Sequence, residues 1–323
     1  MGGGAQVWIV TDGSAGNENL ALAVAEAVGL PVALKRVRVT GAMQLLPSQL
    51  QVYLPPERLL LSVASDETLA PPWPRLIISA GRRSAPIALA VKRNSGAFAL
   101  HILNPRLPLR LFDMIVAPAH DNLQAPNVIA TAGSVHRVTA ARLAEAADRF
   151  KANIAGLPKP RVAVLLGGAS RAFSFKPKDA AELGAKLAEL ARGSGGSLLV
   201  TPSRRTSSAA LAAFSREVAD VPHTIWDGSG DNPYFGFLGL ADAIVVTADS
   251  VNMVTEAVGT GKPVFVQELK GRSVKLAHFH RLLQERDATR PFAGRLETWT
   301  YPPVNDTERV ASAVRRALGL DPR

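Results

Sequence analysis

The chain has 323 residues and a formal net charge of +10, with 47% apolar and 20% charged residues. This composition excludes a disordered chain, and the length is enough for two domains that each bury a core. The absence of cysteine excludes disulfides, thiolate metal sites and a cysteine nucleophile. No apolar run reaches the ~18 residues of a membrane span, and the start lacks a signal-peptide pattern. We therefore expect a cytoplasmic protein, with a peripheral position at the inner face of a membrane as the alternative.

The basic residues occur in pairs rather than in a tail. The pairs are Arg82-Arg83, Lys92-Arg93, Arg204-Arg205 and Arg315-Arg316. Pairs near strand ends suit a phosphorylated ligand, whereas a diffuse basic surface suits an anionic membrane face. The sequence contains no recognisable nucleic-acid-binding motif and only 6% aromatic residues, so we expect no nucleic-acid partner.

The first half of the chain begins with a predicted strand, a glycine turn and a helix. The strand covers Gln6–Thr11 and the helix Glu18–Val28, with Gly13 and Gly16 in the turn. The turn lacks both the third glycine of a dinucleotide fingerprint and the lysine of a phosphate loop. Two interpretations remain open: a plain tight turn, or a turn whose glycines let a ligand approach the backbone.

A second strand end of this half combines glycine with cations. Arg75–Ser79 predicts a buried strand, followed by Gly81, Arg82 and a helix that begins at Pro86. This arrangement favours an anion at the helix start; the alternative is a capped turn with solvated arginines. Residues 41–74, rich in proline and leucine, predict no definite element.

Two later strand ends carry titratable side chains. His120 and Asp121 follow the predicted strand Phe112–Ala117, and His136 follows Val128–Thr131. A histidine beside a carboxylate suits acid–base chemistry, although side chains of adjacent residues usually point apart.

A break in the pattern at Ala155–Pro160 predicts a domain boundary. It follows an alanine-rich helix expected over Arg142–Asn153. We predict an N-terminal, acceptor-side domain over residues 1–155, a C-terminal nucleotide-sugar-binding domain over 160–304, and a closing helix over 305–323.

Three predicted strands of the second half, residues 161–166, 197–201 and 243–247, end in glycine or polar turns. Because the carboxyl ends of parallel strands lie at one edge of a sheet, we expect these turns to converge on one ligand. The candidate residues in these turns are Gly167, Gly168, Ser170, Arg171, Arg204, Asp249 and Ser250.

The last of these turns leads into a predicted helix, Val251–Val258. The free N–H groups and partial positive charge of a helix start favour a phosphate. Glu256 lies about one and a half turns further on, where its carboxylate suits ribose hydroxyls. The alternative is that Ser250 only caps the helix and that Glu256 is only a surface carboxylate.

These residues resemble the donor-binding domain of GT-B glycosyltransferases, a class that includes the membrane-associated transferase of the peptidoglycan lipid precursor. The matching segments are Gly167–Ser170 and Thr247–Val264. The resemblance implies that Ser250 and its neighbours face a donor diphosphate and that Glu256 faces the ribose.

Over nearly the whole chain, the sequence is similar to the family of the plant mitochondrial-fission protein and its bacterial relatives, sometimes described as nucleoside-diphosphate-sugar epimerases. The segments that carry the similarity are Thr11–Ala27, Ile78–Arg93, Asn104–Pro108, Phe112–Asp121, Leu165–Phe173 and Phe279–Phe292. The resemblance implies an α/β fold of two Rossmann-like domains that face each other across a cleft, as in GT-B enzymes.

The reaction is less closely defined by the residues. In the peptidoglycan transferase the first glycine turn carries a histidine proposed as acceptor base, and Asn17 stands at the matching position. No tyrosine has a lysine four places on, as short-chain epimerases require. The remaining catalytic candidates are Asp12, His120, Asp121 and His136.

We expect binding of a nucleotide-sugar donor and glycosyl transfer without a metal, since no D-x-D pair is present and a helix start suits the leaving diphosphate. Gly13, Gly16, Gly81 and Arg82 complete the predicted substrate-binding set, and no cofactor is expected. The alternative is a non-catalytic scaffold that binds a protein or a membrane.

Overall fold

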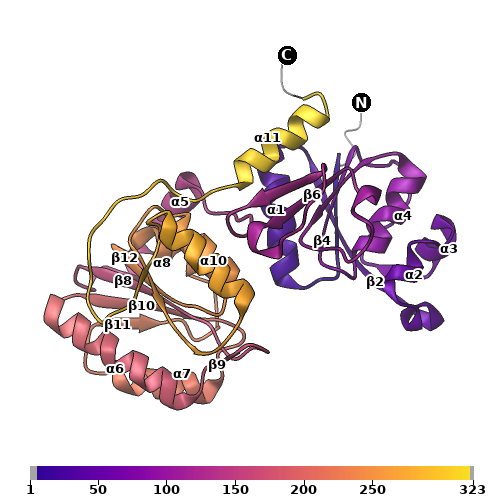
Figure 1. The fold of residues 1–323 in the computed structure, drawn as a ribbon. Helices are drawn as coiled ribbons and strands as arrows, with labels where there is room; N and C mark the ends of the chain where they lie inside the picture. The colour runs from indigo at the N-terminus through magenta and orange to yellow at the C-terminus, as the bar shows by residue number, and fades with distance from the viewer. Residues whose placement is uncertain (1–5, 321–323) are drawn as a thin grey trace. The chain divides into compact units, whose positions relative to one another are not determined.

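A computed structural model describes residues 6–320 of the chain. The chain divides into two compact units, residues 1–137 with 305–323 and residues 138–304. Each unit is a parallel α/β sheet covered by helices (Figure 1), so the predicted α/β fold of two Rossmann-like units is confirmed. In the described part of the chain no helix combines the length and the apolar character of a membrane span.

The described residues of the first unit form a seven-stranded sheet in the order β3-β2-β1-β4-β5-β6-β7. Neighbouring strands are parallel except for the edge strand β3, which is antiparallel to β2. The next strand in the chain, β2, pairs with one side of β1, and β4 pairs with the other side. The strand order therefore reverses between β1 and β4, which is the topological switch point. The strands are β1 (Val7–Thr11), β2 (Val32–Val39), β3 (Val63–Ser65), β4 (Leu76–Ala80), β5 (Phe98–Ile102), β6 (Met114–Pro118) and β7 (Val128–Thr131).

Helices on both faces bury β1 and β4 completely, which explains their continuous apolar sequences. The last helix, α11 (Thr307–Ala317), lies against α1 (Ala15–Val28), and Val310 and Val314 join the core around Val24 (Figure 1). The end of the chain therefore belongs to the first unit. The other helices here are η1 (Gly41–Leu45), α2 (Ser48–Gln51), α3 (Pro56–Leu61), α4 (Ala85–Ser95), η2 (Leu109–Leu111) and η3 (Ala119–Asp121).

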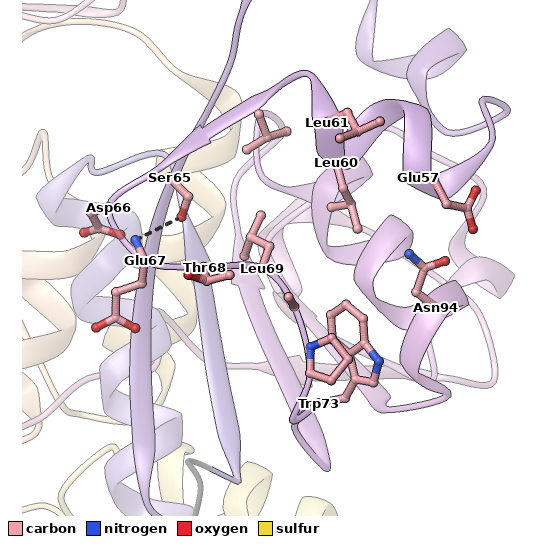
Figure 2. A pocket seen from close by; sticks show the side chains of 13 residues that line it. Glu57, Leu60, Leu61, Ser65, Asp66, Glu67, Thr68, Leu69, Trp73 and Asn94 are labelled. Carbon is pink, nitrogen blue, oxygen red and sulfur yellow. Dashed lines mark hydrogen bonds between the residues drawn. The ribbon is translucent and has the colours of Figure 1, made fainter.

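The segment that the sequence left unassigned, residues 41–74, contains η1, α2, α3 and β3. Beside α3 it encloses a cavity of about 630 Å³. Figure 2 shows Leu60, Leu69 and Trp73 around this cavity, with Asp66 and Glu67 at one end. An apolar and acidic lining does not suit a diphosphate, so we place no nucleotide here.

The second unit is a doubly wound sheet. In its described residues six parallel strands follow the order β11-β10-β8-β12-β13-β15. This is the order 3-2-1-4-5-6 of a Rossmann fold, with the switch point between β8 and β12. The strands are β8 (Arg161–Leu166), β10 (Ser197–Pro202), β11 (His223–Ile225), β12 (Ala243–Thr247), β13 (Val264–Gln267) and β15 (Arg290–Pro291).

In this unit α6 and α7 lie side by side on one face of the sheet, and α8 and α10 lie on the other (Figure 1). A small antiparallel pair of strands, β9 (Phe173–Ser174) and β14 (Lys270–Gly271), joins the loop after β8 to the loop after β13. The helices are α5 (Ala140–Phe150), η4 (Lys151–Ile154), α6 (Pro177–Ser194), α7 (Ser208–Glu217), α8 (Tyr234–Leu240), α9 (Val251–Val258) and α10 (Val274–Glu285).

The boundary between the units differs from the predicted one. It lies at Val138, before α5, rather than between residues 155 and 160. The reason is that α5 packs on α8 of the second unit. Two glycines of α8 allow the close approach, because a β-carbon on Gly236 would lie 2.7 Å from the Phe150 ring and one on Gly239 would lie 2.6 Å from the Leu143 carbonyl oxygen. The predicted closing helix over 305–323 is part of the first unit.

Candidate functional site

The loops after β8 and β12 are hydrogen-bonded to each other at the switch point of the second unit. The Gly167 N–H donates to Thr247 Oγ1 over 2.8 Å, and this hydroxyl donates to Asp249 Oδ1 over 2.7 Å. The Gly168 N–H donates to the other carboxylate oxygen, Asp249 Oδ2, over 3.1 Å. The two glycines therefore hold the strand ends together, and their N–H groups are already used within the chain.

Only glycine fits at these two positions. A β-carbon on Gly167 would lie 2.1 Å from Asp249 Oδ1, and one on Gly168 would lie 2.0 Å from the carbonyl oxygen of Arg205. Both distances are far inside van der Waals contact. This finding differs from the expectation that both glycine N–H groups meet a diphosphate, because close packing of the loops accounts for the glycines.

The loop after β10 closes on the same place. Arg205 forms a 2.7 Å ion pair with Asp249, whose side chain is 0% exposed. The Thr206 hydroxyl donates to the Gly167 carbonyl oxygen over 2.6 Å. Asp249, predicted to contact the substrate, thus has both oxygens engaged and positions the loops instead, and a buried carboxylate needs such partners.

The sequence predicted a ligand contact for Arg204 and no role for Arg205. Arg204 and Arg171 are exposed. Across residues 6–320, neither side chain forms an ion pair or a hydrogen bond. The adjacent arginines were the available signal, but the residue types alone do not tell which one pairs with the buried Asp249. The two exposed guanidinium groups leave uncompensated positive charge near the carboxyl ends of β8 and β10.

The loop and helix start on either side of the switch point have well-defined caps. Ser250 Oγ accepts a 3.4 Å hydrogen bond from the Met253 N–H, so this serine caps α9. Ser170 Oγ accepts from the Phe173 N–H over 3.1 Å and shapes the β8 loop. In the described part of the chain the N–H of Val251 has no hydrogen-bond partner, and it adds to the positive end of the helix dipole.

Glu256 has a specific partner on α8. The Tyr234 hydroxyl donates to Glu256 Oε2 over 2.7 Å. Burial, with the carboxylate of Glu256 as a second cause, raises the pKa of Tyr234 well above its usual range, so the hydroxyl keeps its proton. The carboxylate is therefore oriented, and it remains half-buried rather than enclosed.

A cavity of about 380 Å³ lies beside this site, between the end of β13 and α10. It is lined in part by Phe173, Ala248, Glu268 and His280. His280 Nε2 donates to the Ala248 carbonyl oxygen over 2.8 Å, since a carbonyl can only accept. Burial lowers the pKa of His280. Neither helix α10 nor the hydrogen bond of His280 was predicted, because residues 279–292 were recognised only as a family motif.

In the first unit the structure brings Asn17 and Gly81 together at the switch point of β1 and β4. A β-carbon on Gly81 would lie 2.3 Å from Asn17 Nδ2, and Gly81 has a φ of +80°. Gly13 has a φ of +77°, which a tight turn requires. Gly16 lies in α1 with no neighbour within 4 Å of an added β-carbon. The predicted glycine turns therefore exist at this strand end.

The titratable candidates of the first unit differ in access. His120 Nε2 lies 3.7 Å from Asp121 Oδ1, and both side chains are less than 10% exposed. His136 is buried, and its backbone exchanges two 3.0 Å hydrogen bonds with the Thr307 hydroxyl.

Two other candidates of the first unit are more accessible. Asp12 is half-buried and accepts from the Ser14 hydroxyl over 2.8 Å. Arg82 is exposed. The catalytic and substrate-binding roles of these residues stay predictions.

Comparison with known proteins agrees with the motifs. A family model described as "Mitochondrial fission ELM1" matches residues 15–318. The chain is 34% identical over 281 residues to the mitochondrial fission protein ELM1 of Arabidopsis thaliana, which covers 76% of this chain and 64% of that relative. The chain thus spans less than two thirds of the relative's length. The family resemblance indicated by the sequence is confirmed.

Solved structures share the fold at low sequence identity. The UDP-GlcNAc 2-epimerase of Methanocaldococcus jannaschii is similar with a TM-score of 0.58 and 12% identity, over 96% of this chain and 99% of that one. The UDP-GlcNAc 2-epimerase of Neisseria meningitidis, solved with UDP-GlcNAc, gives 0.51 and 14%, over 98% and 100%. At these identities the likeness concerns the fold alone, and it agrees with the predicted GT-B class.

Proposed function

The chain belongs to the mitochondrial fission ELM1 family, and from this premise we propose that its second unit binds a nucleoside-diphosphate sugar at the carboxyl ends of β8 and β12. The observation that carries the proposal is the oriented carboxylate of Glu256, one and a half turns into the helix that starts at a Rossmann switch point. Similar folds in UDP-GlcNAc 2-epimerases, one of them solved with UDP-GlcNAc, support this ligand class.

The diphosphate would lie at the start of α9. The helix dipole and the N–H of Val251 face an anion there, and the exposed guanidinium groups of Arg171 and Arg204 add positive charge. Gly167 and Gly168 would contribute by placing the β8 loop close to the helix start rather than by donating their N–H groups. The contacts to phosphate in this proposal are therefore fewer than the sequence suggested.

The ribose would lie further along α9. One oxygen of Glu256 accepts from Tyr234. A carboxylate can accept several hydrogen bonds at once, so Glu256 would also accept from ribose hydroxyls. A hydrogen bond to a charged group contributes about 1.5–3 kcal/mol. Glu256 would therefore supply much of the affinity for the nucleoside part.

The reaction we propose for this donor is glycosyl transfer without a metal. An acceptor hydroxyl attacks the anomeric carbon, the bond to the diphosphate breaks, and the leaving group takes the electron pair. The start of α9 would stabilise the charge that develops on the diphosphate. The candidates for the base that takes the hydroxyl proton are Asp12, His120, Asp121 and His136. Asn17 does not titrate and would act only as a hydrogen-bonding group.

The second candidate function is a scaffold that keeps the GT-B body and binds a protein or membrane partner. One observation favours it: the glycine loop that many donor sites use for phosphate is hydrogen-bonded within this chain. The name of the Arabidopsis relative, a mitochondrial fission protein, also fits a role outside sugar chemistry.

Titration calorimetry with UDP, GDP and their N-acetylglucosamine or mannose sugars tests the proposal. We expect wild type to bind one of these, and Glu256→Ala to bind about ten- to a hundred-fold more weakly. Glu189→Ala is the matched control, because this carboxylate is exposed on α6 and has no partner among the described residues. If wild type binds no nucleotide at millimolar concentration, the donor site is wrong and the scaffold function stands.

A further inference from the structure

A cavity of about 510 Å³ lies in the first unit, where β1 and β2 end and the loop before α4 begins. Its polar lining comes from four separate parts of the chain, and the apolar remainder is formed by β2, the segment after η1 and α4. The polar lining residues are Asp12, Arg38, Gln44, Ser48, Gln51 and Arg83.

The two arginines of this cavity carry uncompensated charge. Arg38 and Arg83 are exposed, and within residues 6–320 neither side chain forms an ion pair or a hydrogen bond. Arg36, two places before Arg38 on β2, shows the contrast: its guanidinium lies 2.8 Å from Glu18 and 3.5 Å from Asp66. The chain therefore neutralises one arginine of the strand and leaves the next one open to the cavity.

One wall of the cavity is held in place by a buried side chain. Gln51 is 5% exposed, and its side-chain amide donates to the Leu46 carbonyl oxygen over 2.8 Å. This bond fixes the short turn that carries Gln44 and Ser48 into the cavity lining. A wall anchored in this way keeps the cavity open without a ligand, which lowers the cost of ordering on binding.

The charge balance of the lining selects an anion. Two guanidinium groups face one carboxylate, Asp12, so the cavity keeps a net positive charge. Guanidinium groups prefer phosphate and carboxylate oxygens, which accept two parallel hydrogen bonds from each. A phosphate monoester carries close to two negative charges near neutral pH, which matches two arginines better than a single carboxylate does.

We propose that this cavity is a binding site for the phosphate group of a phosphate ester, held by Arg38 and Arg83. Asp12 accepts a hydrogen bond from a hydroxyl group of the same ligand, and Leu46, Pro47 and Ile87 contact the apolar part of the ligand. The site lies within the first unit and does not rest on the proposed donor site. The phosphate comes either from a soluble sugar phosphate or from a lipid headgroup.

Calorimetric titration of the full chain with glucose 1-phosphate tests the soluble source. We expect Arg38→Gln and Arg83→Gln each to weaken binding about ten-fold, and the wild-type affinity to fall as salt rises. The control is Arg58→Gln, an exposed arginine of α3 that has no side-chain partner in the described residues and does not line the cavity. It should bind as wild type does.

Sedimentation with vesicles tests the lipid source, using phosphatidic acid in phosphatidylcholine against phosphatidylcholine alone. Loss of sedimentation in the Arg38→Gln/Arg83→Gln double variant, but not in Arg58→Gln, assigns the site to a lipid phosphate. Thermal melts confirm that the variants are folded. The proposal is overturned if wild type binds neither probe, or if the cavity variants bind both probes as Arg58→Gln does. UDP binding that depends on Glu256 is unaffected by either result, so the two proposals fail separately.

Discussion

The Tyr234 hydroxyl donates a 2.7 Å hydrogen bond to the Glu256 carboxylate and thereby joins the start of α8 to the last turn of α9. The raised pKa of Tyr234 keeps its proton in place at any physiological pH. An isolated carboxylate on a helix surface samples several rotamers, whereas this one is held in a single direction. Orientation before binding lowers the entropy cost of recognising a ligand.

Replacing Tyr234 by Phe should therefore weaken nucleotide binding without removing a ligand contact. The lost hydrogen bond to a charged group contributes about 1.5–3 kcal/mol to the folded protein. Only its effect on the orientation of Glu256 acts on binding, so we expect a smaller change, a roughly two- to ten-fold higher dissociation constant by calorimetry. Tyr53→Phe is the control, because Tyr53 is 72% exposed and lies in the other unit. Equal affinities of the two variants would show that Glu256 is not oriented by Tyr234 or does not touch the nucleotide.

The glycine loop makes a prediction about stability. Gly168→Ala would place a β-carbon 2.0 Å from a backbone oxygen of Arg205, which cannot move like a side-chain end. We expect a loss of about 1–3 kcal/mol of unfolding free energy in urea, the usual cost of overpacking. The β8 and β10 loops should separate, so nucleotide binding should fall as well.

The control for this change is Gly193→Ala in α6. An added β-carbon there has no neighbour within 4 Å, and the position is helical. Alanine is favoured over glycine in a helix by about 0.5–1 kcal/mol, so this variant should be slightly more stable than wild type. A Gly168→Ala protein as stable as Gly193→Ala would contradict the close packing of the loops.

Lys262 makes a third prediction, which concerns the end of α8. Its ammonium group donates to the carbonyl oxygens of Leu238, Gly239 and Ala241 over 2.6–2.7 Å. Terminal carbonyls of a helix have no partner within the helix. Lys262→Met keeps the length of the side chain but leaves these half-buried acceptors without a donor, so we expect a loss of about 3 kcal/mol.

Chemical denaturation measures this loss. The control is Lys178→Met on α6, whose side chain is 82% exposed and pairs only weakly with Glu182 at 4.0 Å. Surface ion pairs of this kind contribute between about 0 and 1 kcal/mol. A comparable stability of the two variants would mean that the three carbonyls find other donors when Lys262 is absent.

Much of the fold followed from local sequence. The strand over Ala243–Thr247, the helix over Val251–Val258 and the glycine stop after it were all predicted, since buried β-branched runs and helical spacing are local signals. The boundary before α5 was not predicted, because the choice of partner for an alanine-rich helix depends on the surface of α8. Residues 41–74 contain short helices, which have too few turns to show a hydrophobic periodicity.

The site was predicted less completely than the fold. The turns after β8 and β12 and the position of Glu256 followed from strand ends and helix spacing. The ion pair of Arg205 with Asp249, the hydrogen bond from Tyr234 to Glu256 and the contact of His280 with Ala248 arise from tertiary packing. Residue type alone also suggested ligand contacts for Gly167 and Asp249, whereas the structure uses them to join two loops.

A buried histidine of the first unit gives the last prediction, a pH dependence of stability. His101 on β5 is 0% exposed, and its Nδ1 lies 2.8 Å from the Ser79 hydroxyl. In the described part of the chain its Nε2 has no hydrogen-bond partner. Burial lowers the pKa of His101 from 6.5 to about 3, so the folded state holds this imidazole neutral.

The sign of the effect follows from proton binding. Between pH 3 and pH 6.5 the unfolded chain protonates His101 and the folded chain does not, so stability falls as pH falls. The slope from one such group is about 1.4 kcal/mol per pH unit, which amounts to a loss of about 2 kcal/mol between pH 7 and pH 5.

Urea denaturation at pH 7 and pH 5 measures this loss of stability, with His101→Gln as the matched variant. Because glutamine does not titrate, the variant should lose about 2 kcal/mol less than wild type over the same interval, whatever its stability at pH 7. Parallel losses in the two proteins would mean that His101 is not the group responsible and that it takes up a proton in the folded state.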